Sequence, residues 1–428
     1  MNTVTLRSGA LYGDRTIELR FPDDWQVQVA EAGEMSALSD DQLRAALQHP
    51  IGSPALAELA RTRRSAAILI DDIMRPTPTA RLLPLIVAEL EAAGMPRSAI
   101  RIVIASGAHS SATAEDINRK VGERISRELV VVPHHAERDL AFVGRSARGT
   151  PVYVNQTVMA SELKIGVGGV YPHAIAGFSG GSKILMPGVC GLQTVRYVHD
   201  SFEGAGRHGG SLDNAFRHEA DAIATMVGLD FVIDVLLTPT RDIAGLFAGD
   251  KIAAHRDGVR AASERYRVAV VEDADVIVAN TYPFDTSLYF IPRGFWPFAA
   301  GKRAASRVAV ADGSMGQGHH GFRPPKRHGW TRLTRALAMM QPTERGRQER
   351  RVAATMVKKA MTKHQAEFLM FSAGLRPEAL AAVFPRAQLF HAWEPLRQTL
   401  ETRHPRGPVK VAVYPYAPLQ LPGGGGPR

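Results

Sequence analysis

The sequence predicts an α/β protein in which two domains with mostly parallel sheets enclose an active-site cleft. Short apolar runs rich in Val and Ile alternate with helix-length amphipathic stretches, which is the pattern of strand and helix units around a parallel sheet. The length of 428 residues allows two or three domains, and 45% hydrophobic with 22% charged residues is the composition of a chain that buries a core. These values exclude disorder and collagen.

The first half of the chain predicts a series of buried strands separated by amphipathic helices. An apolar run without alternation is typical of a strand that is covered on both faces, and a repeat near 3.6 residues is typical of a helix on the sheet. We expect strands over 66–70, 101–106, 129–134, 151–154, 163–167 and 231–237. Helices are expected over 79–94, 114–125 and 250–266.

The second half repeats this pattern after a boundary near Tyr266. Strands are expected over 267–271, 275–280, 307–312, 367–374, 387–392 and 409–415, with basic helices at about 331–362. We therefore predict an N-terminal α/β domain of residues 1–265 and a C-terminal α/β domain of residues 266–428.

Cysteine content and hydropathy indicate a soluble protein of a reducing compartment. The single cysteine, Cys190, excludes an intramolecular disulfide and any site with several thiolate ligands. No apolar run approaches the roughly 20 residues of a membrane span, and the N-terminus lacks a secretory pattern. The expected location is the cytoplasm, without a membrane partner.

The net charge of +10 is concentrated in one segment. Residues 323–351 contain nine Lys or Arg and two Glu. No aromatic ladder or nucleic-acid-binding motif is interleaved with them, so we interpret the segment as a solvated, Arg-rich helical face and do not expect nucleic acid as a partner.

Polar side chains follow the strands at the end where α/β proteins bind ligands. Asp71, Asp72 and Arg75 follow the strand over 66–70, and His109 and His173 follow two further strands. A pair of aspartates before a turn commonly caps a helix, and a lone histidine after a strand is commonly a loop residue. Their coincidence at neighbouring strand ends nevertheless predicts a site.

A Gly-rich segment that contains Ser179, Gly180, Gly181 and Lys183 is the densest signal. Its glycines allow tight turns that direct backbone N–H groups at an anion. It is not a Walker A loop, because Ile184 follows the lysine where Ser or Thr is required. Lys183 is able to pair with a phosphate, to be acylated or to form a Schiff base, and the residues alone do not choose.

Three histidines leave a zinc hydrolase open as an alternative. His199 lies sixteen residues after Lys183, and together with His109 and His173 it offers three imidazole ligands. Their spacing matches no local zinc signature such as H-E-x-x-H, so this alternative is the weaker one.

These segments resemble the nickel-pincer-nucleotide lactate racemase family over roughly residues 65–320. The matching motifs, in family order and spacing, are Asp71-Asp-x-x-Arg75-Pro-Thr-Pro, Ser106-Gly-x-His109, Pro172-His173, Gly177-Phe-Ser-Gly-Gly-x-Lys183, Pro187-Gly188 and His199. Further agreement lies in Gly249-Asp250, Ala254-His255 and Tyr282-Pro283-x-Asp285-x-x-Leu288-Tyr289.

The resemblance implies an isomerase, a racemase or epimerase of a 2-hydroxy acid, with a nickel-pincer nucleotide (pyridinium-3-thioamide-5-thiocarboxylic acid mononucleotide with bound Ni) as cofactor. It implies that Lys183 tethers the cofactor, that His199 ligates nickel, and that His109 and His173 are paired acid/base catalysts. Cofactor contacts are implied for Asp72, Ser179, Gly180 and Gly181, and substrate contacts for Arg75, Tyr289, Phe290 and Arg293. The implied partners are the small 2-hydroxy acid and the enzymes that make the cofactor.

Two positions depart from the lactate-acting members of that family. Phe290 and Arg293 stand where those members have a glutamine and a lysine, which removes one polar contact and replaces an ammonium by a guanidinium. We therefore expect a substrate other than lactate: a larger or more apolar 2-hydroxy acid, a sugar acid, or a 2-hydroxy diacid bound through Arg293. The alternative is a family member without racemase activity, acting as a 2-hydroxy or keto acid binding protein or as another oxidoreductase.

Overall fold

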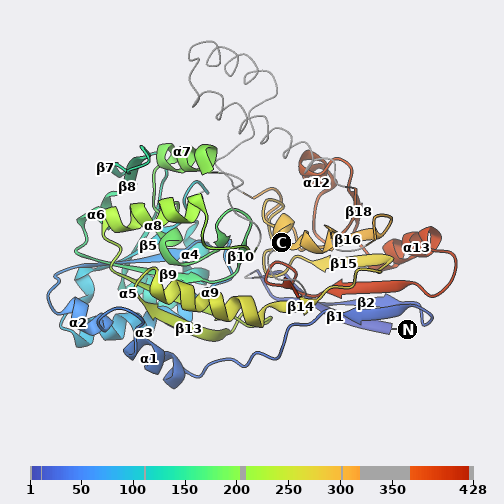
Figure 1. The fold of residues 1–428 in the computed structure, drawn as a ribbon, viewed down its shortest axis with the longest axis horizontal. Helices are drawn as coiled ribbons and strands as arrows, with labels where there is room; N and C mark the ends of the chain where they lie inside the picture. Colours follow the sequence, from blue (N-terminus) through green and yellow to red (C-terminus); the bar gives the residue numbers. More distant parts are fainter. Residues whose placement is uncertain are drawn as a thin grey trace, which may run out of the picture.

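The computed structural model describes residues 2–10, 12–109, 112–202, 209–299, 302–318 and 367–423. Within them lie two six-stranded sheets, which form the centres of a first and a second lobe (Figure 1). The strand order is β13-β12-β9-β4-β5-β6 in the first sheet and β18-β17-β16-β15-β19-β3 in the second. The predicted α/β class with mostly parallel sheets is confirmed.

The first sheet is parallel except at one edge. Its strands are β4 (Ala66–Asp71), β5 (Ile100–Ala105), β6 (Val130–Pro133), β9 (Leu163–Gly169), β12 (Phe231–Leu237) and β13 (Ile243–Gly249). Only β13 pairs antiparallel, with β12. β4, β9 and β12 are buried along their whole length, which explains their unbroken apolar sequences.

Helices cover both faces of this sheet (Figure 1). One face is covered by α1 (Asp40–Gln48), α2 (Leu56–Ala60), α3 (Thr79–Ala92), α4 (Ala114–Val121) and α5 (Glu123–Glu128). The other carries α6 (Gln156–Ala160), α7 (Leu192–Phe202) and α8 (Ala215–Val227), and α9 (Ala253–Arg265) packs on β12 and β13. The helix expected over 114–125 is two helices, because Gly122 with φ +83° ends the first one.

The second lobe contains the later strands of the chain. They are β15 (Val276–Asn280), β16 (Ser306–Val310), β17 (Leu369–Phe371), β18 (Gln388–Phe390) and β19 (Lys410–Tyr414), all parallel. Its helices are α12 (Pro377–Val383) and α13 (Trp393–Arg403), with 3-10 turns η3 (Ile291–Gly294) and η4 (Trp296–Ala299). A short parallel pair, β14 (Arg267–Ala269) with β20 (Leu421–Gly423), begins at the expected boundary near residue 266.

The N-terminal segment lies in the second lobe, unlike the expected division into residues 1–265 and 266–428. β3 (Gln26–Val29) pairs in parallel with β19, from Gln26 beside Lys410 to Val29 beside Val413. The hairpin of β1 (Asn2–Ser8) and β2 (Arg15–Phe21) shares an apolar core with α13. The reason is that pairing between the two ends of a chain is a tertiary property that a local apolar pattern does not report.

Two further expectations differ from the structure or fall outside it. The strand over 151–154 is β8 (Pro151–Asn155), which pairs antiparallel with β7 (Leu140–Arg145) in a separate hairpin rather than joining the parallel sheet. The basic segment 323–351 and the helices at about 331–362 lie outside the described residues. Among the residues that are described, no helix is long and apolar enough to cross a membrane.

We predict that His134→Asn reduces the loss of stability in acid. His134 follows β6, is fully buried, and bonds through Nε2 to the Cys190 carbonyl at 3.0 Å. Burial lowers its pKa to about 4. The unfolded chain therefore binds a proton between about pH 6.5 and 4 that the folded chain does not, so the free energy of unfolding falls as the pH falls.

Between about pH 6.5 and 4, the substitution should lower the slope of the free energy of unfolding against pH by up to about 1.4 kcal/mol per pH unit. Urea unfolding of both proteins at several pH values between about 4 and 7 measures the slope. Identical slopes would contradict the assignment of a buried neutral imidazole.

Candidate active site

Three loops that carry predicted site residues lie at the carboxyl ends of the strands of the first sheet. β4 lies between β5 and β9, and all three strands run parallel. The loops that follow them at their carboxyl ends carry Asp72 and Arg75, His109, and His173. This arrangement confirms that parallel strands deliver these segments to a common region.

His109 is held by Asp72. Its Nδ1 lies 2.5 Å from Oδ2 of Asp72, whose Oδ1 accepts the backbone N–H of Met74 at 2.9 Å. Burial opposes ionisation of this carboxyl group, but the nearby charges of His109 and Arg75 lower its pKa to about 2. In the structure the carboxylate of Asp72 contacts the imidazole of His109, and the cofactor contact that the resemblance implies for Asp72 stays a prediction.

Asp71 has a different role from its neighbour. Its carboxylate pairs with the buried ammonium of Lys120 at 2.6 Å and accepts the Thr77 hydroxyl at 2.5 Å. Lys120 also donates to the backbone carbonyls of Arg75 at 2.9 Å and Thr77 at 3.0 Å. One lysine of α4 thus holds the loop from 71 to 77. This role was not predicted from the sequence, because an amphipathic helix normally exposes its lysines.

His173 is buried, and its Nδ1 accepts the backbone N–H groups of Ile175 and Ala176, both at 3.2 Å. Burial, together with the charges of Lys183 and Arg293, lowers the pKa of His173 well below its ordinary value. Its imidazole is therefore neutral.

The Gly-rich segment forms a tight turn as predicted, but one of its backbone N–H groups is bonded within the protein. Gly180 and Gly181 have φ of +91° and +58°. The N–H of Gly181 donates to both carboxylate oxygens of Asp234, at 3.0 and 2.9 Å, and Asp234 also contacts Nδ1 of His255 at 2.6 Å. On the other side, Arg217 donates to the Gly180 carbonyl at 3.0 Å. A buried carboxylate, histidine and arginine thus fix the turn that precedes Lys183.

Lys183 and His199 lie beside the same aromatic ring. The Nζ atom of Lys183 is 6.0 Å from the centroid of Phe216, and the His199 ring is 5.9 Å from it. Burial and the charges of Arg75 and Arg293 lower the pKa of Lys183 well below its ordinary value, which favours the neutral, nucleophilic form of its amine. Burial, with a smaller contribution from Lys183, lowers the pKa of His199 to about 4, so the imidazole is in the neutral form that ligates metals.

The second lobe contributes a segment that contains Phe290 and Arg293. The buried Phe290 ring lies 5.4 Å from the His109 ring, 4.8 Å from Cζ of Arg75 and 5.3 Å from Cζ of Arg293. Burial and the charge of Arg75 lower the pKa of Arg293 to about 9. Nη1 of both arginines is buried and has no hydrogen-bond partner among the described residues. Two unpaired buried donors suit an anion.

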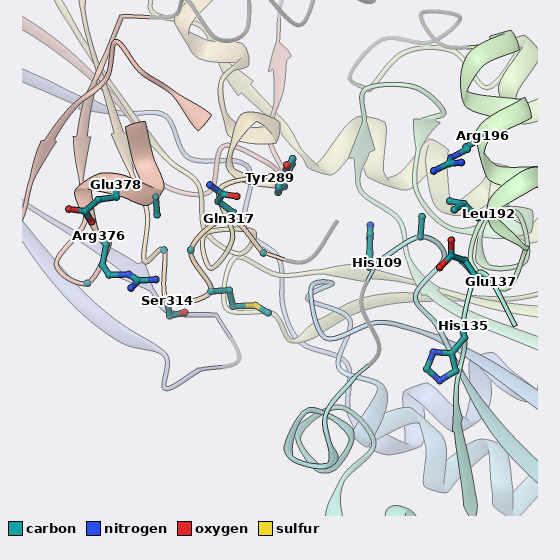
Figure 2. A pocket seen from close by; sticks show the side chains of 18 of the residues that line it. His109, His135, Glu137, Leu192, Arg196, Tyr289, Ser314, Gln317, Arg376 and Glu378 are labelled. Atoms are coloured by element: carbon teal, nitrogen blue, oxygen red, sulfur yellow. The ribbon is translucent and has the colours of Figure 1, made fainter. Parts of the chain in front are cut away.

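A cleft of about 1350 Å³ opens next to these residues, between the two lobes. Figure 2 shows His109, Glu137 and Arg196 on one wall and Tyr289, Gln317 and Arg376 facing them. Of the predicted site residues, His109 and Tyr289 line the cleft. The charged residues Glu137, Arg196 and Arg376 were missed, because single charges on loops and helices carry no sequence signal of their own.

The zinc hydrolase alternative finds no ligand set in the structure. Among the described residues, no group of three or more His, Cys, Asp or Glu side chains is arranged to hold a metal ion. His109 and His173 instead engage a carboxylate and backbone amides.

Together, these features define a two-lobed α/β protein with a basic, histidine-containing site at the strand ends. Residues 12–208 match the lactate racemase N-terminal domain. The lactate racemase of Lactiplantibacillus plantarum is 30% identical over 323 residues, 73% of this chain and 76% of that protein. The lactate racemase of Thermoanaerobacterium thermosaccharolyticum is 27% identical over 323 residues, 73% of this chain and 75% of that protein.

Solved structures agree on the fold. The lactate racemase apoprotein of Thermoanaerobacterium thermosaccharolyticum superposes with a TM-score of 0.74 at 22% identity, covering 98% of this chain and 100% of that chain. A protein from Thermotoga maritima reaches 0.63 at 15% identity, covering 91% and 99%. The chain belongs to the lactate racemase family and is an isomerase, a racemase of 2-hydroxy acids.

We predict that Gly181→Ala destabilises the protein more than Gly407→Ala does. A Cβ at position 181 would lie 2.7 Å from Cγ of His255, whereas a Cβ at Gly407 would meet nothing within 4 Å. Both glycines have positive φ, so both changes cost about 1–2 kcal/mol of backbone strain. The clash should add about 1–3 kcal/mol for Gly181→Ala only.

Urea unfolding of Gly181→Ala and Gly407→Ala measures the difference. An equal loss of stability in the two variants would show that His255 does not support the turn.

Proposed function

We propose that this isomerase uses a nickel-pincer nucleotide tethered to Lys183 and acts on a 2-hydroxy acid other than lactate. The observation that carries the proposal is that the amine of Lys183 and the imidazole of His199 lie beside the same Phe216 ring. An amine of this kind is able to be acylated, and one imidazole with sulfur and carbon donors suits square-planar nickel. The residues present therefore fit the group.

When bound, the cofactor would accept the hydride that leaves C2 of the substrate. The chain itself would bind the substrate and move its hydroxyl proton. His109 would act as a base, because Asp72 contacts its Nδ1 and orients the ring. The guanidinium of Arg75 would bind the substrate carboxylate and the oxygen on which charge develops.

The substrate class is inferred from Phe290 and Arg293. Phe290 is packed between His109 and Arg75, so it occupies space where a polar side chain would add a hydrogen bond. Arg293 adds a second guanidinium, and Nη1 of each arginine is unpaired among the described residues. Two such groups favour a 2-hydroxy diacid over the larger apolar acid or sugar acid that the sequence also allows.

The protein would need enzymes that make the cofactor in the same compartment. The cytoplasm is the proposed location, in keeping with the single buried cysteine. The remaining alternative, a protein that binds 2-hydroxy or keto acids without racemising them, would show binding of both enantiomers with no loss of optical purity.

We predict that Lys183 and His199 have separable roles in cofactor loading. After coexpression with the cofactor biosynthesis enzymes, Lys183→Ala should lack the added mass, whereas His199→Ala should keep it and lose nickel, because only the lysine is a covalent tether. Lys164→Ala is the matched control, since Lys164 is also buried but donates to the Ser161 carbonyl away from the strand ends.

Intact mass and metal analysis of the three variants measure loading. Nickel content in His199→Ala equal to that of the wild type would contradict the ligand assignment, and an unmodified Lys183 in the wild type would contradict the proposed function.

We predict that Phe290→Gln with Arg293→Lys shifts preference toward lactate. The double variant regains a polar contact and an ammonium, and it should raise kcat/KM for lactate relative to a 2-hydroxy diacid by about 10- to 200-fold, as expected for a difference of about 1–3 kcal/mol. Loss of optical purity, measured for a panel of chiral 2-hydroxy acids with loaded enzyme, tests this. If lactate is the best substrate of the wild type, these positions do not set specificity.

A further inference from the structure

The N-terminal hairpin lies at the position of the second sheet where α/β sheets usually bind ligands. Ligands bind at the carboxyl ends of the strands, at the point where the strand order reverses. The first sheet reverses between β4 and β9, which is where the candidate site lies, and the second reverses between β15 and β19. There Asn280, the last residue of β15, donates through Nδ2 to the carbonyls of Arg7 at 2.9 Å and Pro415 at 2.8 Å. The end of β15 thus binds the chain's own N-terminal segment.

The loop between β1 and β2, described at residues 9, 10 and 12–14 and called the hairpin loop below, is held by carboxylates of the second lobe. The buried Asp285 accepts the backbone N–H groups of Gly9 at 2.7 Å and Ala10 at 3.3 Å. Arg15, the first residue of β2, pairs with the buried Asp312 at 2.6 Å. Both ends of the hairpin loop are therefore attached to the second lobe.

The hairpin loop also reaches α4 of the first lobe. The hydroxyl of Tyr12 donates to Oδ1 of Asp116 at 2.9 Å, and Cζ of Arg119 lies 5.0 Å from the centroid of the Tyr12 ring. α4 also carries Lys120, whose ammonium donates to the backbone carbonyl of Arg75 at 2.9 Å. Tyr12 is therefore bonded to the helix that holds the loop after β4 in the candidate site.

A second attachment to the first lobe lies at the turn between β12 and β13. The Asp14 carboxylate contacts the guanidinium of Arg241 in that turn and accepts the hydroxyl of Tyr282 at 2.8 Å. The Tyr282 hydroxyl in turn accepts the Nε–H of Arg241 at 2.9 Å. The Asp14 and Arg241 side chains are only 26% and 16% exposed, so solvent and salt screen their contact less than they screen a surface ion pair. These three side chains link the two lobes.

The second-lobe partners of the hairpin loop belong to the segment that enters the candidate site. Tyr282 and Asp285 stand near its start, and Phe290 and Arg293 stand near its end, where the N–H of Arg293 donates to the Phe290 carbonyl at 3.0 Å. The Phe290 ring lies 4.8 Å from Cζ of Arg75 in the first lobe. One short segment therefore connects the hairpin loop to the part of the site that the second lobe supplies.

We propose that the hairpin loop is an interlobe strap, in which Tyr12 and Asp14 are positioning residues that hold Phe290 and Arg293 in register with the first lobe. The part of this inference that concerns the lobes does not depend on the proposed function. The part that concerns the substrate rests on the proposed function, in which Arg293 binds the substrate.

Apolar contacts between the lobes do not by themselves define this register. Ile73, Met74 and Tyr171 of the first lobe share a core with Phe284 and Phe290 of the second. Hydrophobic burial is non-directional, so this core resists separation of the lobes more than it resists their sliding or rotation. Hydrogen bonds weaken steeply when their angle departs from linearity. The strap therefore supplies the directional contacts that favour one arrangement of the lobes.

The strap should act on substrate binding rather than on the chemical step. The groups proposed for the cofactor and for proton transfer, Lys183, His199 and His109, all stand on the first lobe. Arg293 is a proposed substrate contact from the second lobe. Loss of the strap would misplace Arg293 and leave the proton-transfer groups where they are, which raises KM with little change in kcat.

Electron paramagnetic resonance of the chain without cofactor tests the strap. Spin labels at Thr225→Cys on α8 and Gln398→Cys on α13 report the distance between the lobes, since both positions are exposed and the native Cys190 is buried. Tyr12→Phe with Asp14→Asn removes the hydroxyl and the charge while keeping both side chains nearly the same size. We expect a longer or broader distance distribution in this double variant, and an unchanged distribution would overturn the proposal. Each change is also made singly, so that the test stands if the double variant does not fold.

Tyr414→Phe with Asp275→Asn is the matched control. It also removes one phenolic hydroxyl and one carboxylate charge, but the contacts that it breaks lie within the second lobe. The Tyr414 hydroxyl accepts the N–H of Val271 at 3.2 Å, and Asp275 pairs with Lys302 at 2.8 Å. The control should leave the distance distribution unchanged. An equal change in the control and in the strap variant would reflect general destabilisation and would overturn the proposal.

Kinetics of the loaded enzyme test the link to the substrate, with lactate and malate as probes. Tyr12→Phe with Asp14→Asn should raise KM by about 10-fold and change kcat by less than about 2-fold, whereas the control should change neither. The adduct mass at Lys183 is measured first in every sample. A lower kcat with unchanged KM in a fully loaded strap variant would overturn the positioning role. A missing adduct in the wild type would count against the proposed function alone, because the distance measurement needs no cofactor.

Discussion

The buried ion pair between Lys120 and Asp71 is the constraint on which the site depends. It joins α4 to the end of β4, and Lys120 uses its remaining donors on the carbonyls of Arg75 and Thr77. Breaking such a pair from one side costs about 3–5 kcal/mol, because the remaining charge stays buried. These contacts hold the loop that carries Asp72, and Asp72 in turn contacts Nδ1 of His109.

A second buried set of charges acts in the same way on the Gly-rich turn. Asp234 accepts the N–H of Gly181 and contacts His255, and Arg217 binds the carbonyl of Gly180. Lys183 follows this turn directly, so its position depends on these buried groups. Cations outnumber carboxylates among the groups that act on Lys183, and the resulting positive potential suits an anionic substrate and a nucleotide phosphate.

The sequence was most informative where a property is local. The strand runs and the polar residues after them are local, so the loops after β4, β5 and β9 were predicted correctly. The pairing of β3 with β19 was not predicted, because it joins residues almost 400 positions apart and QVQV is a weak strand signal. The role of Lys120 was not predicted either, because its partners lie on another element. The partners of the Gly181 N–H and of Asp72 are likewise set by the tertiary fold.

The residues proposed for catalysis and those proposed for specificity come from different lobes. The groups proposed for the cofactor and for proton transfer, such as Lys183, His199 and His109, stand on loops and helices of the first lobe, where buried charges fix them. Phe290 and Arg293 come from the second lobe and meet the first at Arg75 and His109. In the proposed function, a substitution at these two positions would alter the surroundings of the substrate without touching the ion pair of Lys120 or the turn before Lys183. In the proposed function, the same proton-transfer groups would serve different 2-hydroxy acids, because side chains of the second lobe would select among them.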